Sequence, residues 1–282
     1  MEETTEQSTE QKPQSDTFEV KQSTLVAGAV VIAIIIIGFY LGSVFSDVGN
    51  SLDYVVDNGL LVSSDDDAFI GNEDSLVSIV EFSDFHCPVC GMFFKETVLE
   101  VKKNYVDTGK VNFVYRDFPI LSLHANAGTY AQASECGDDQ GKFWELHDIF
   151  YNANYDFYSL PAEERGESPF TVELLQNYSE EAGLDLEELN SCLDSGKYID
   201  EVNNDLADGQ FYGVGGTPNM FIVAKKELTD LQLSALNEIA SIVAEQAGAS
   251  YITIYNSEQV TTIHIKAALN YQTVSAILDV LV

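Results

Sequence analysis

The sequence predicts an α/β domain with an inserted helical block, preceded by one N-terminal transmembrane helix. A long uncharged apolar run lies near the N-terminus, and strand-like runs alternate with helical patterns further on. The stretch from about 124 to 208 shows helical patterns only. The expected organisation is a disordered cytoplasmic tail over 1–23, a transmembrane anchor over 24–45, a linker over 46–67 and the folded domain over 68–282.

The charge balance of the chain is extreme. Its 282 residues include 46 Asp and Glu against 13 Lys and Arg, which gives a formal net charge of −33. Such a chain repels phosphates, so nucleic-acid binding is excluded from the expected functions. Because the acidic residues are spread along the sequence, a solvated acidic surface is favoured over a dedicated site for a cationic partner.

The apolar run LVAGAVVIAIIIIGFYLGSVF, from Leu25 to Phe45, is long enough to cross a bilayer. At about 1.5 Å per residue it spans roughly 30 Å as a helix. The acidic tail before it and its length are unlike a cleaved signal peptide, which favours an anchor. Lys12 and Lys21 precede the run, and the next basic residue is Lys95. This asymmetry predicts a cytoplasmic tail and an extracytoplasmic domain.

The folded domain opens with a strand–helix–strand pattern. The run LVSIVEF over 76–82 is short, apolar and rich in β-branched residues, as buried strands are. A helical pattern follows over 88–105, and VNFVYRDF over 111–118 is a second strand. This order predicts a parallel strand pair with a right-handed crossover.

The inserted block is followed by a return to mixed structure. A strand is expected within GVGGTPNMFIVA, which runs from 213 to 224. Thr229 with Gln232 predicts a capped amphipathic helix to about 246, a hairpin follows around Asn256, and YQTVSAILDVLV closes the chain as a helix. Within the block the periodic segments predict helices over 125–136, 141–152, 171–182, 186–195 and 198–209.

Two cysteines frame the motif Cys87-Pro88-Val89-Cys90 directly after the first strand. At a helix N-terminus the first thiolate is favoured by unpaired backbone N–H groups, and Pro88 fits the first turn. Cys87 is therefore predicted to be the exposed nucleophile and Cys90 the buried resolving partner. A zinc site is disfavoured because a second ligand pair is missing, and a structural disulfide across so short a loop would constrain little.

Several segments in a fixed order resemble the DsbA-like thiol–disulfide oxidoreductases of the thioredoxin superfamily. They are VEFSDFHCPVCGMFF, YRDFPI, GKFWELHDIF, CLDSGKY and GVGGTPNMFIV, between about residues 65 and 223. The resemblance implies a thioredoxin-like fold with a helical insertion over about 124–208. In that family the connection after the proline strand is short, whereas here residues 225–262 are added, and we interpret them as cover for the sheet edge rather than a docking surface.

The resemblance also implies roles for single residues. Cys87 and Cys90 match the active pair, and Pro218, after Thr217, matches a cis-proline that faces the pair. Glu81 matches a buried acid that takes the proton of the second cysteine, unless it is an exposed strand residue. For His86 two readings stand open: a protonated ring that stabilises the Cys87 thiolate, or a solvent-facing side chain. The remaining histidines are interpreted as packing or surface residues: His124, His147 and His264.

The other two cysteines, Cys136 and Cys192, both fall in the helical block. With Cys87 and Cys90 pairing locally, a structural disulfide between these two is favoured over free thiols or a second redox pair. Asn177-Tyr178-Ser179 is a glycosylation sequon.

These features predict an extracytoplasmic, membrane-anchored thiol–disulfide oxidoreductase that acts on cysteines of exported proteins. An oxidase is favoured over a reductase or isomerase, although Pro88 and Val89 inside the motif do not decide the direction. An oxidase implies a quinone-linked membrane partner. A non-redox, chaperone-like peptide-binding module is the alternative of another class. No cofactor or metal is expected.

Overall fold

The computed structural model describes residues 55–56 and 59–282. The predicted tail over 1–23, the predicted anchor over 24–45 and half of the predicted linker over 46–67 lie outside these residues. Within the part that is described, every helix is too short or too polar to cross a membrane.

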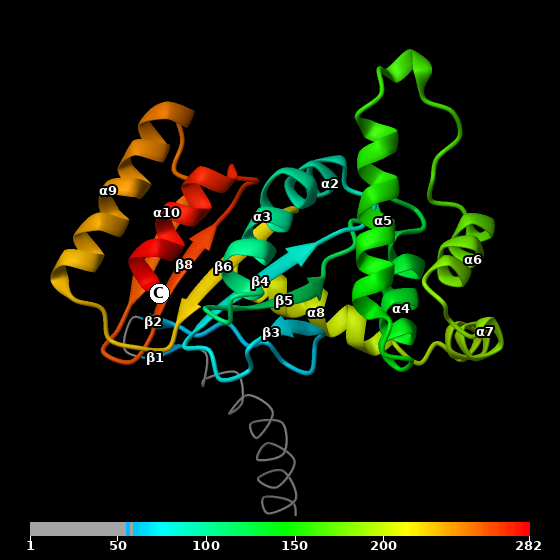
Figure 1. Cartoon of the computed structure of the whole chain (residues 1–282), viewed down its shortest axis with the longest axis horizontal. Helices are drawn as coiled ribbons and strands as arrows, with labels where there is room; N and C mark the ends of the chain where they lie inside the picture. Colours follow the sequence, from blue (N-terminus) through cyan, green and yellow to red (C-terminus); the bar gives the residue numbers. More distant parts are fainter. Residues whose placement is uncertain (1–54, 57–58) are drawn as a thin grey trace, which may run out of the picture. The chain divides into compact units, whose positions relative to one another are not determined.

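A six-stranded sheet forms the centre of the domain (Figure 1). The two strands on either side of the cysteine motif run parallel, which confirms the predicted strand–helix–strand unit, and every other pair of neighbours in the sheet is antiparallel. In spatial order the strands are β3 (Phe69–Gly71), β5 (Asn112–Asp117), β4 (Val77–Ser83), β6 (Asn219–Ala224), β8 (Thr261–Ile265) and β7 (Ile252–Asn256).

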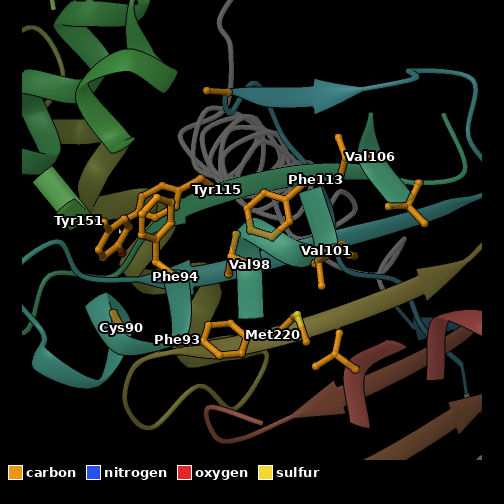
Figure 2. Packing of buried hydrophobic residues seen from close by; sticks show 14 of the residues in the cluster. Cys90, Phe93, Phe94, Val98, Val101, Val106, Phe113, Tyr115, Tyr151 and Met220 are labelled. Carbon is orange, nitrogen blue, oxygen red and sulfur yellow. Dashed lines mark hydrogen bonds between the residues drawn. The ribbon is translucent and has the colours of Figure 1, made fainter. Parts of the chain in front are cut away.

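The helix after the motif is interrupted by two wider π turns, where a continuous helix over 88–105 was expected. It consists of α2 (Pro88–Phe93), η1 (Phe94–Val98), α3 (Leu99–Val101) and η2 (Lys102–Val106). Its apolar side chains lie over one face of the sheet, as Figure 2 shows. The closing helix α10 (Tyr271–Leu281) packs beside it on η1 and α3.

The opposite face of the sheet is covered by α8 (Ile199–Phe211) and by the segment before β3. This segment includes the ribbon of β1 (Val55–Val56) and β2 (Gly59–Leu60), and β2 packs against β7 and β8. Val62 is 3% exposed and belongs to the core cluster on this face. The folded unit therefore begins before residue 68, and the end of the predicted linker is part of the core, because its apolar residues cover sheet that would otherwise face water.

The helical insertion matches the predicted block closely (Figure 1). Asp185 begins one helix by accepting hydrogen bonds from the backbone N–H groups of Glu187 and Glu188, as its spacing predicted. The sequon lies within another helix, where Asn177 is exposed and Ser179 is buried. Besides α8, the elements are α4 (Ala127–Asp138), α5 (Phe143–Tyr158), the 3₁₀ turn η3 (Ala162–Glu164), α6 (Val172–Glu181) and α7 (Leu186–Ser195).

The added segment between β6 and α10 completes one side of the domain. It begins with α9 (Asp230–Ala247), where Thr229 and Gln232 form the predicted capping box. The predicted hairpin follows as β7 and β8, and α9 packs on α10 and on the edge strand β7. The segment thus extends the sheet and covers its edge, as the sequence interpretation held.

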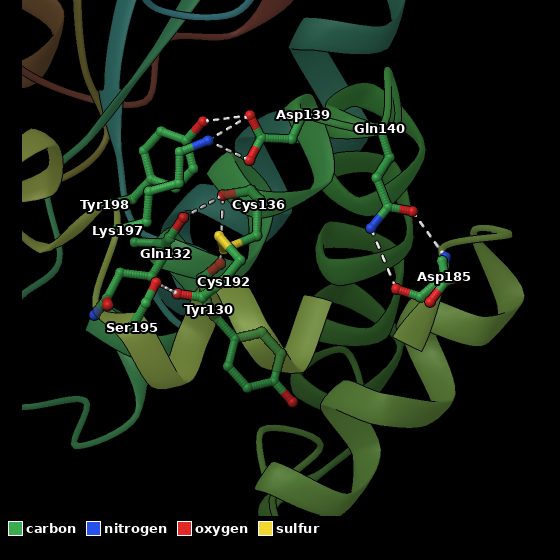
Figure 3. The surroundings of a disulfide bond; sticks show 12 residues. Tyr130, Gln132, Cys136, Asp139, Gln140, Asp185, Cys192, Ser195, Lys197 and Tyr198 are labelled. Atoms are coloured by element: carbon green, nitrogen blue, oxygen red, sulfur yellow. Dashed lines mark hydrogen bonds and ion pairs between the residues drawn. A yellow bond between two sulfur atoms is a disulfide. The ribbon is translucent and has the colours of Figure 1, made fainter. Parts of the chain in front are cut away.

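Cys136 and Cys192 form a disulfide that joins α4 to α7, with their Cα atoms 6.0 Å apart. Figure 3 shows the polar contacts around it, including Lys197 and Tyr198 on the carboxylate of Asp139. The bond closes a loop with a sequence separation of 56 residues. It therefore ties together two helices of the insertion that are far apart in sequence.

Replacing both Cys136 and Cys192 with Ser should lower the free energy of unfolding by about 4 kcal/mol, since the open loop gains entropy in the unfolded chain. Denaturant unfolding of the wild type and the double variant measures this difference. Identical midpoints would show that the bond does not stabilise the fold.

A buried ion-pair cluster links the sheet to α8. Arg116 on β5 is fully buried and contacts the carboxylates of Asp67, Asp205 and Asp208. Glu135 is buried nearby, where desolvation first and the charge of Asp205 second raise its pKa to about 8. One cation thus faces several buried carboxyl groups, and some of these groups stay protonated at neutral pH.

The cluster predicts that the fold loses stability as the pH rises. A carboxyl whose folded pKa is raised keeps its proton in the native state at pH values where the unfolded chain has lost it. Its contribution to the free energy of unfolding is therefore fully present below about pH 4.5 and is lost as the pH rises toward 8. The melting temperature should therefore fall between pH 5 and pH 8. Glu135→Gln should make this decline shallower, and an equally steep decline in that variant would contradict the assignment.

Candidate active site

The chain enters the cysteine motif directly from the central strand β4. Cys87 is the N-cap of α2 and Pro88 occupies its first turn, as the sequence predicted. Cys90 is fully buried as predicted, but Cys87 is only 6% exposed, so the expectation of an exposed nucleophile is wrong, and both are free thiols. The first sulfur therefore lies at the helix N-terminus, where unpaired N–H groups favour a negative charge.

Asn154 of the insertion holds the motif loop in place. Its side-chain amide donates to the backbone carbonyls of Phe85 at 2.8 Å and Cys87 at 3.1 Å. This contact depends on Gly91, because a Cβ at that position would lie 2.1 Å from the Asn154 side-chain oxygen. The glycine after the motif thus allows a helix of the insertion to position the reactive loop.

The two sulfurs have opposite pKa shifts. The pKa of Cys87 is lowered to about 6, mainly by a hydrogen bond from the Cys90 thiol, while burial opposes the shift and contacts with Thr217 and backbone N–H groups add to it. Burial raises the pKa of Cys90 well above its ordinary value, and the neighbouring Cys87 raises it further. One sulfur is therefore a thiolate near neutral pH and the other a thiol.

Thr217 and Pro218 lie against the motif from the start of β6, and the peptide bond between them is cis. The Cys87 sulfur is 3.5 Å from the carbonyl oxygen of Thr217. Beside this contact lies an open groove of about 420 Å³. Val89 lines it together with Thr217, Pro218, the glycines of the preceding loop, Asn219 and the segment Lys266, Ala267 and Ala268.

Glu81 is buried in the middle of β4, so the alternative of an exposed strand residue is wrong. Side chains alternate along a strand, so Glu81 shares the face of Ile79, which is the face covered by α2 and η1. Desolvation raises its pKa to about 7, and the charge of Cys87 adds to the rise. Glu81 is thus a proton acceptor of suitable pKa beneath the cysteine pair.

His86 meets neither of the two expectations for it. The ring is buried, stacked on Phe170 with 3.9 Å between ring centroids, and lies edge-on to Tyr130. This desolvation lowers the pKa of His86 to about 4, so the ring is neutral at pH 7. It cannot supply positive charge to Cys87, and it does not face solvent.

The sequence reasoning missed a pair of residues beside the motif. Asp84, at the end of β4, is buried, and its carboxylate accepts a hydrogen bond from Nδ1 of His124 at 2.7 Å. No local sequence pattern connects these residues, because they lie 40 positions apart. His147 and His264 are buried, the first among aromatic rings and the second stacked on Phe221, which agrees with their interpretation as packing residues.

The described residues also include carboxylates close enough to hold a cation. The carboxylates of Asp67, Glu201 and Asp205 lie within 4.8 Å of one another, as do those of Asp65, Asp66 and Glu201. Arg116 already supplies a positive charge to this cluster. The cluster lies on the α8 side of the sheet, whereas the motif helix lies on the other, so these groups take no part in the thiol site.

Gly91→Ala should destabilise the motif loop, since the new methyl group would displace Asn154 and remove its two hydrogen bonds. The expected loss is about 2 kcal/mol in the free energy of unfolding, with faster alkylation of the buried Cys90. Gly166→Ala is the matched control, because a Cβ there meets no atom within 4 Å. Equal stability of the two variants would contradict the role assigned to Asn154.

The chain is similar in sequence to known proteins over much of the described part. A family model described as Thioredoxin matches residues 63–239. A probable disulfide bond formation protein D of Bacillus anthracis is 30% identical over 155 residues, which cover 54% of this chain and 68% of that protein. A putative protein-disulfide oxidoreductase of Rickettsia felis is 28% identical over 162 residues, covering 56% of this chain and 53% of that protein.

Two further proteins are similar to the chain, one in sequence and one in fold. Na(+)/H(+) antiporter NhaA 1 of Salinispora arenicola is 27% identical over 194 residues, or 69% of this chain, but the chain spans only 27% of the antiporter's length. The solved structure of α-DsbA1 from Wolbachia pipientis superposes with a TM-score of 0.54 at 18% identity, covering 78% of this chain and 93% of that one. At that identity the likeness establishes the fold alone.

Proposed function

The chain belongs to the thioredoxin family, and we propose that it is a thiol–disulfide oxidoreductase that donates disulfides to exported proteins. The opposite pKa shifts of Cys87 and Cys90 carry the proposal. A nucleophilic sulfur ionised near pH 6 and a buried partner within hydrogen-bonding reach are what thiol–disulfide exchange requires. The relatives from Bacillus and Rickettsia bear names of the same activity.

The reaction follows from this asymmetry. A substrate thiolate attacks the Cys87 sulfur of the Cys87–Cys90 disulfide, a mixed disulfide forms, and Cys90 leaves as a thiolate. A second substrate thiolate then attacks the substrate sulfur of the mixed disulfide, and Cys87 leaves. The substrate loses two electrons and gains a disulfide, while the enzyme becomes the dithiol. The low pKa makes Cys87 the better leaving group, which favours release of the oxidised substrate.

The groove beside Pro218 supports a place for the substrate chain. Thr217, which lines it, contacts the Cys87 sulfur through its carbonyl oxygen, and glycines also line it, so a backbone can approach closely. Val89, a further lining residue, is 42% exposed and offers an apolar contact. An extended segment around the substrate cysteine fits these features.

The proposed direction is oxidation, because stabilising the Cys87 thiolate stabilises the reduced enzyme and makes its disulfide more oxidising. The dithiol must then be returned to the disulfide by a membrane oxidant of the quinone-linked class. In that step Cys90 has to lose its proton before it attacks a mixed disulfide at Cys87. Glu81, with a pKa of about 7, is the proposed acceptor.

We also propose that the domain is extracytoplasmic and anchored through the apolar run over 24–45. The Cys136–Cys192 bond supports this location, because structural disulfides persist mainly in oxidising compartments. The Lys distribution around the run supports the orientation.

Cys87→Ser should abolish the oxidation of a reduced dithiol peptide by the full chain. Cys90→Ser, given the same peptide in its disulfide form, should instead trap it as a mixed disulfide, because the Cys87 thiolate attacks the peptide disulfide and the resolving sulfur is gone. Mass spectrometry after acid quenching detects the adduct. Full oxidation activity in Cys87→Ser would contradict the proposed enzyme and leave a peptide-binding role.

Glu81→Gln should slow the attack of Cys90 on a mixed disulfide about 100-fold, because the proton acceptor is lost. In the wild type this rate should rise between pH 6 and pH 8 as Glu81 loses its proton, and the variant should lack that rise. Glu100→Gln, at an exposed position on α3, is the matched control. An unchanged pH profile in Glu81→Gln would assign proton transfer to another group.

A further inference from the structure

A buried aspartate organises the backbone at the base of the reactive loop. The Asp84 carboxylate accepts hydrogen bonds from the backbone N–H of His86 at 2.8 Å and of Ile120 at 2.8 Å. Its own carbonyl accepts from the backbone N–H of Cys87 at 3.0 Å. Asp84 therefore joins the loop that carries Cys87 to the segment between β5 and α4.

The same carboxylate orients a histidine from that segment. Nδ1 of His124 lies 2.7 Å from Oδ2 of Asp84, and the Asp84 side chain is fully buried. A carboxylate at Nδ1 fixes the ring orientation and favours the doubly protonated imidazolium. The ring is close to the motif, since its centroid lies 6.1 Å from that of His86, the residue before Cys87.

We propose that the Asp84–His124 pair is a positioning device that holds a positive charge beside Cys87 and so stabilises its thiolate. The inference rests on the proposed function and extends it to two residues outside the motif. His124 acts through the field at the sulfur, and Asp84 acts by orienting His124.

The electrostatics of the four histidines in the described part of the chain single out this one. Burial lowers the pKa values of His86, His147 and His264. The pKa of His124 is raised, first by the hydrogen bond to Asp84 and also by the charge of Cys87. The attraction between imidazolium and thiolate is reciprocal, so it must also lower the pKa of Cys87. Hydrogen bonds, first from the Cys90 thiol, are the main causes of the low Cys87 pKa. The proposal adds the charge of His124 to these causes.

Other charged or titratable groups surround this pair and enter the interpretation of any titration. His86 lies on the motif loop, Glu81 lies on β4, and Tyr158 at the end of α5 interacts with both Asp84 and Cys87. The Arg165 guanidinium lies over the Tyr158 ring, 5.2 Å from its centroid. On β5, Asp117 feels the charge of Asp84. The Asp84 carboxylate bonds directly to the side chain of His124 and not to the side chain of any of these surrounding groups.

The first test removes the charge and keeps the hydrogen bond. In His124→Gln the amide can still donate to Asp84, so the loop should stay folded while the thiolate loses its counter-charge. The Cys87 pKa should rise by roughly 0.5 to 1 unit, which means that the thiolate binds a proton about three to ten times more tightly. Thiolate absorbance and alkylation rate, each followed against pH in the full chain, measure this pKa. His124→Lys should restore a low value.

His86→Phe is the matched control, because a phenyl ring fits the stack on Phe170 and the neutral His86 supplies no charge. It should leave the Cys87 pKa unchanged. An unchanged Cys87 pKa in His124→Gln, or an equal rise in His86→Phe, would overturn the inference while leaving the proposed function intact. An ordinary thiol pKa in the wild type would overturn both.

A second measurement needs no substitution. The His124 pKa, read from its ring proton resonances in NMR, should be higher in the dithiol form than in the Cys87–Cys90 disulfide form, because only the dithiol form carries a thiolate. The resonances of the buried His264 serve as the internal reference. Equal His124 pKa values in the two forms would overturn the proposal even if the variants fail to fold.

Discussion

The site depends on placing a negative charge on a sulfur that is almost fully buried. Burial alone would raise the pKa of Cys87, but the contacts of its sulfur lower that pKa on balance. The compensation comes from the N-terminus of α2, from the Cys90 thiol and from Thr217, which lies 130 positions further along the chain. Each must keep its position relative to the sulfur, and Asn154 and Asp84 hold the backbone of the motif loop by hydrogen bonds.

The acidic character of the chain reaches its core as well as its surface. Arg116 gathers buried carboxylates on the sheet face opposite the motif helix, and desolvation raises the pKa of Glu135 there. On the other face, the same physical cause raises the pKa of Glu81 beneath the cysteines. Desolvation thus raises carboxyl pKa values on both sides of the sheet. On one side the groups belong to the ion-pair cluster that joins the sheet to α8, and on the other Glu81 becomes a proton acceptor near neutral pH.

The sequence was sufficient wherever the signal was local. The strand before Cys87, the caps at Asp185 and Thr229, and the hairpin after α9 follow from short patterns, and the structure confirms them. The errors concern contacts that sequence distance hides. His86 was considered because it adjoins Cys87, yet Phe170 buries it, whereas His124 reaches the motif only through Asp84. The end of the predicted linker likewise packs on the sheet through Val62, and no periodic pattern in the sequence predicts this packing.

The reduction potential of the cysteine pair tests the account most directly. The full chain would be equilibrated in graded glutathione buffers, its thiols trapped by alkylation, and the titrating cysteines identified by mass spectrometry. A Cys87–Cys90 couple at about −120 to −180 mV, with Cys136 and Cys192 oxidised throughout, is the result expected for a donor of disulfides. A couple at about −250 mV or below would contradict the stabilised thiolate and indicate a reductase supplied with electrons from the membrane.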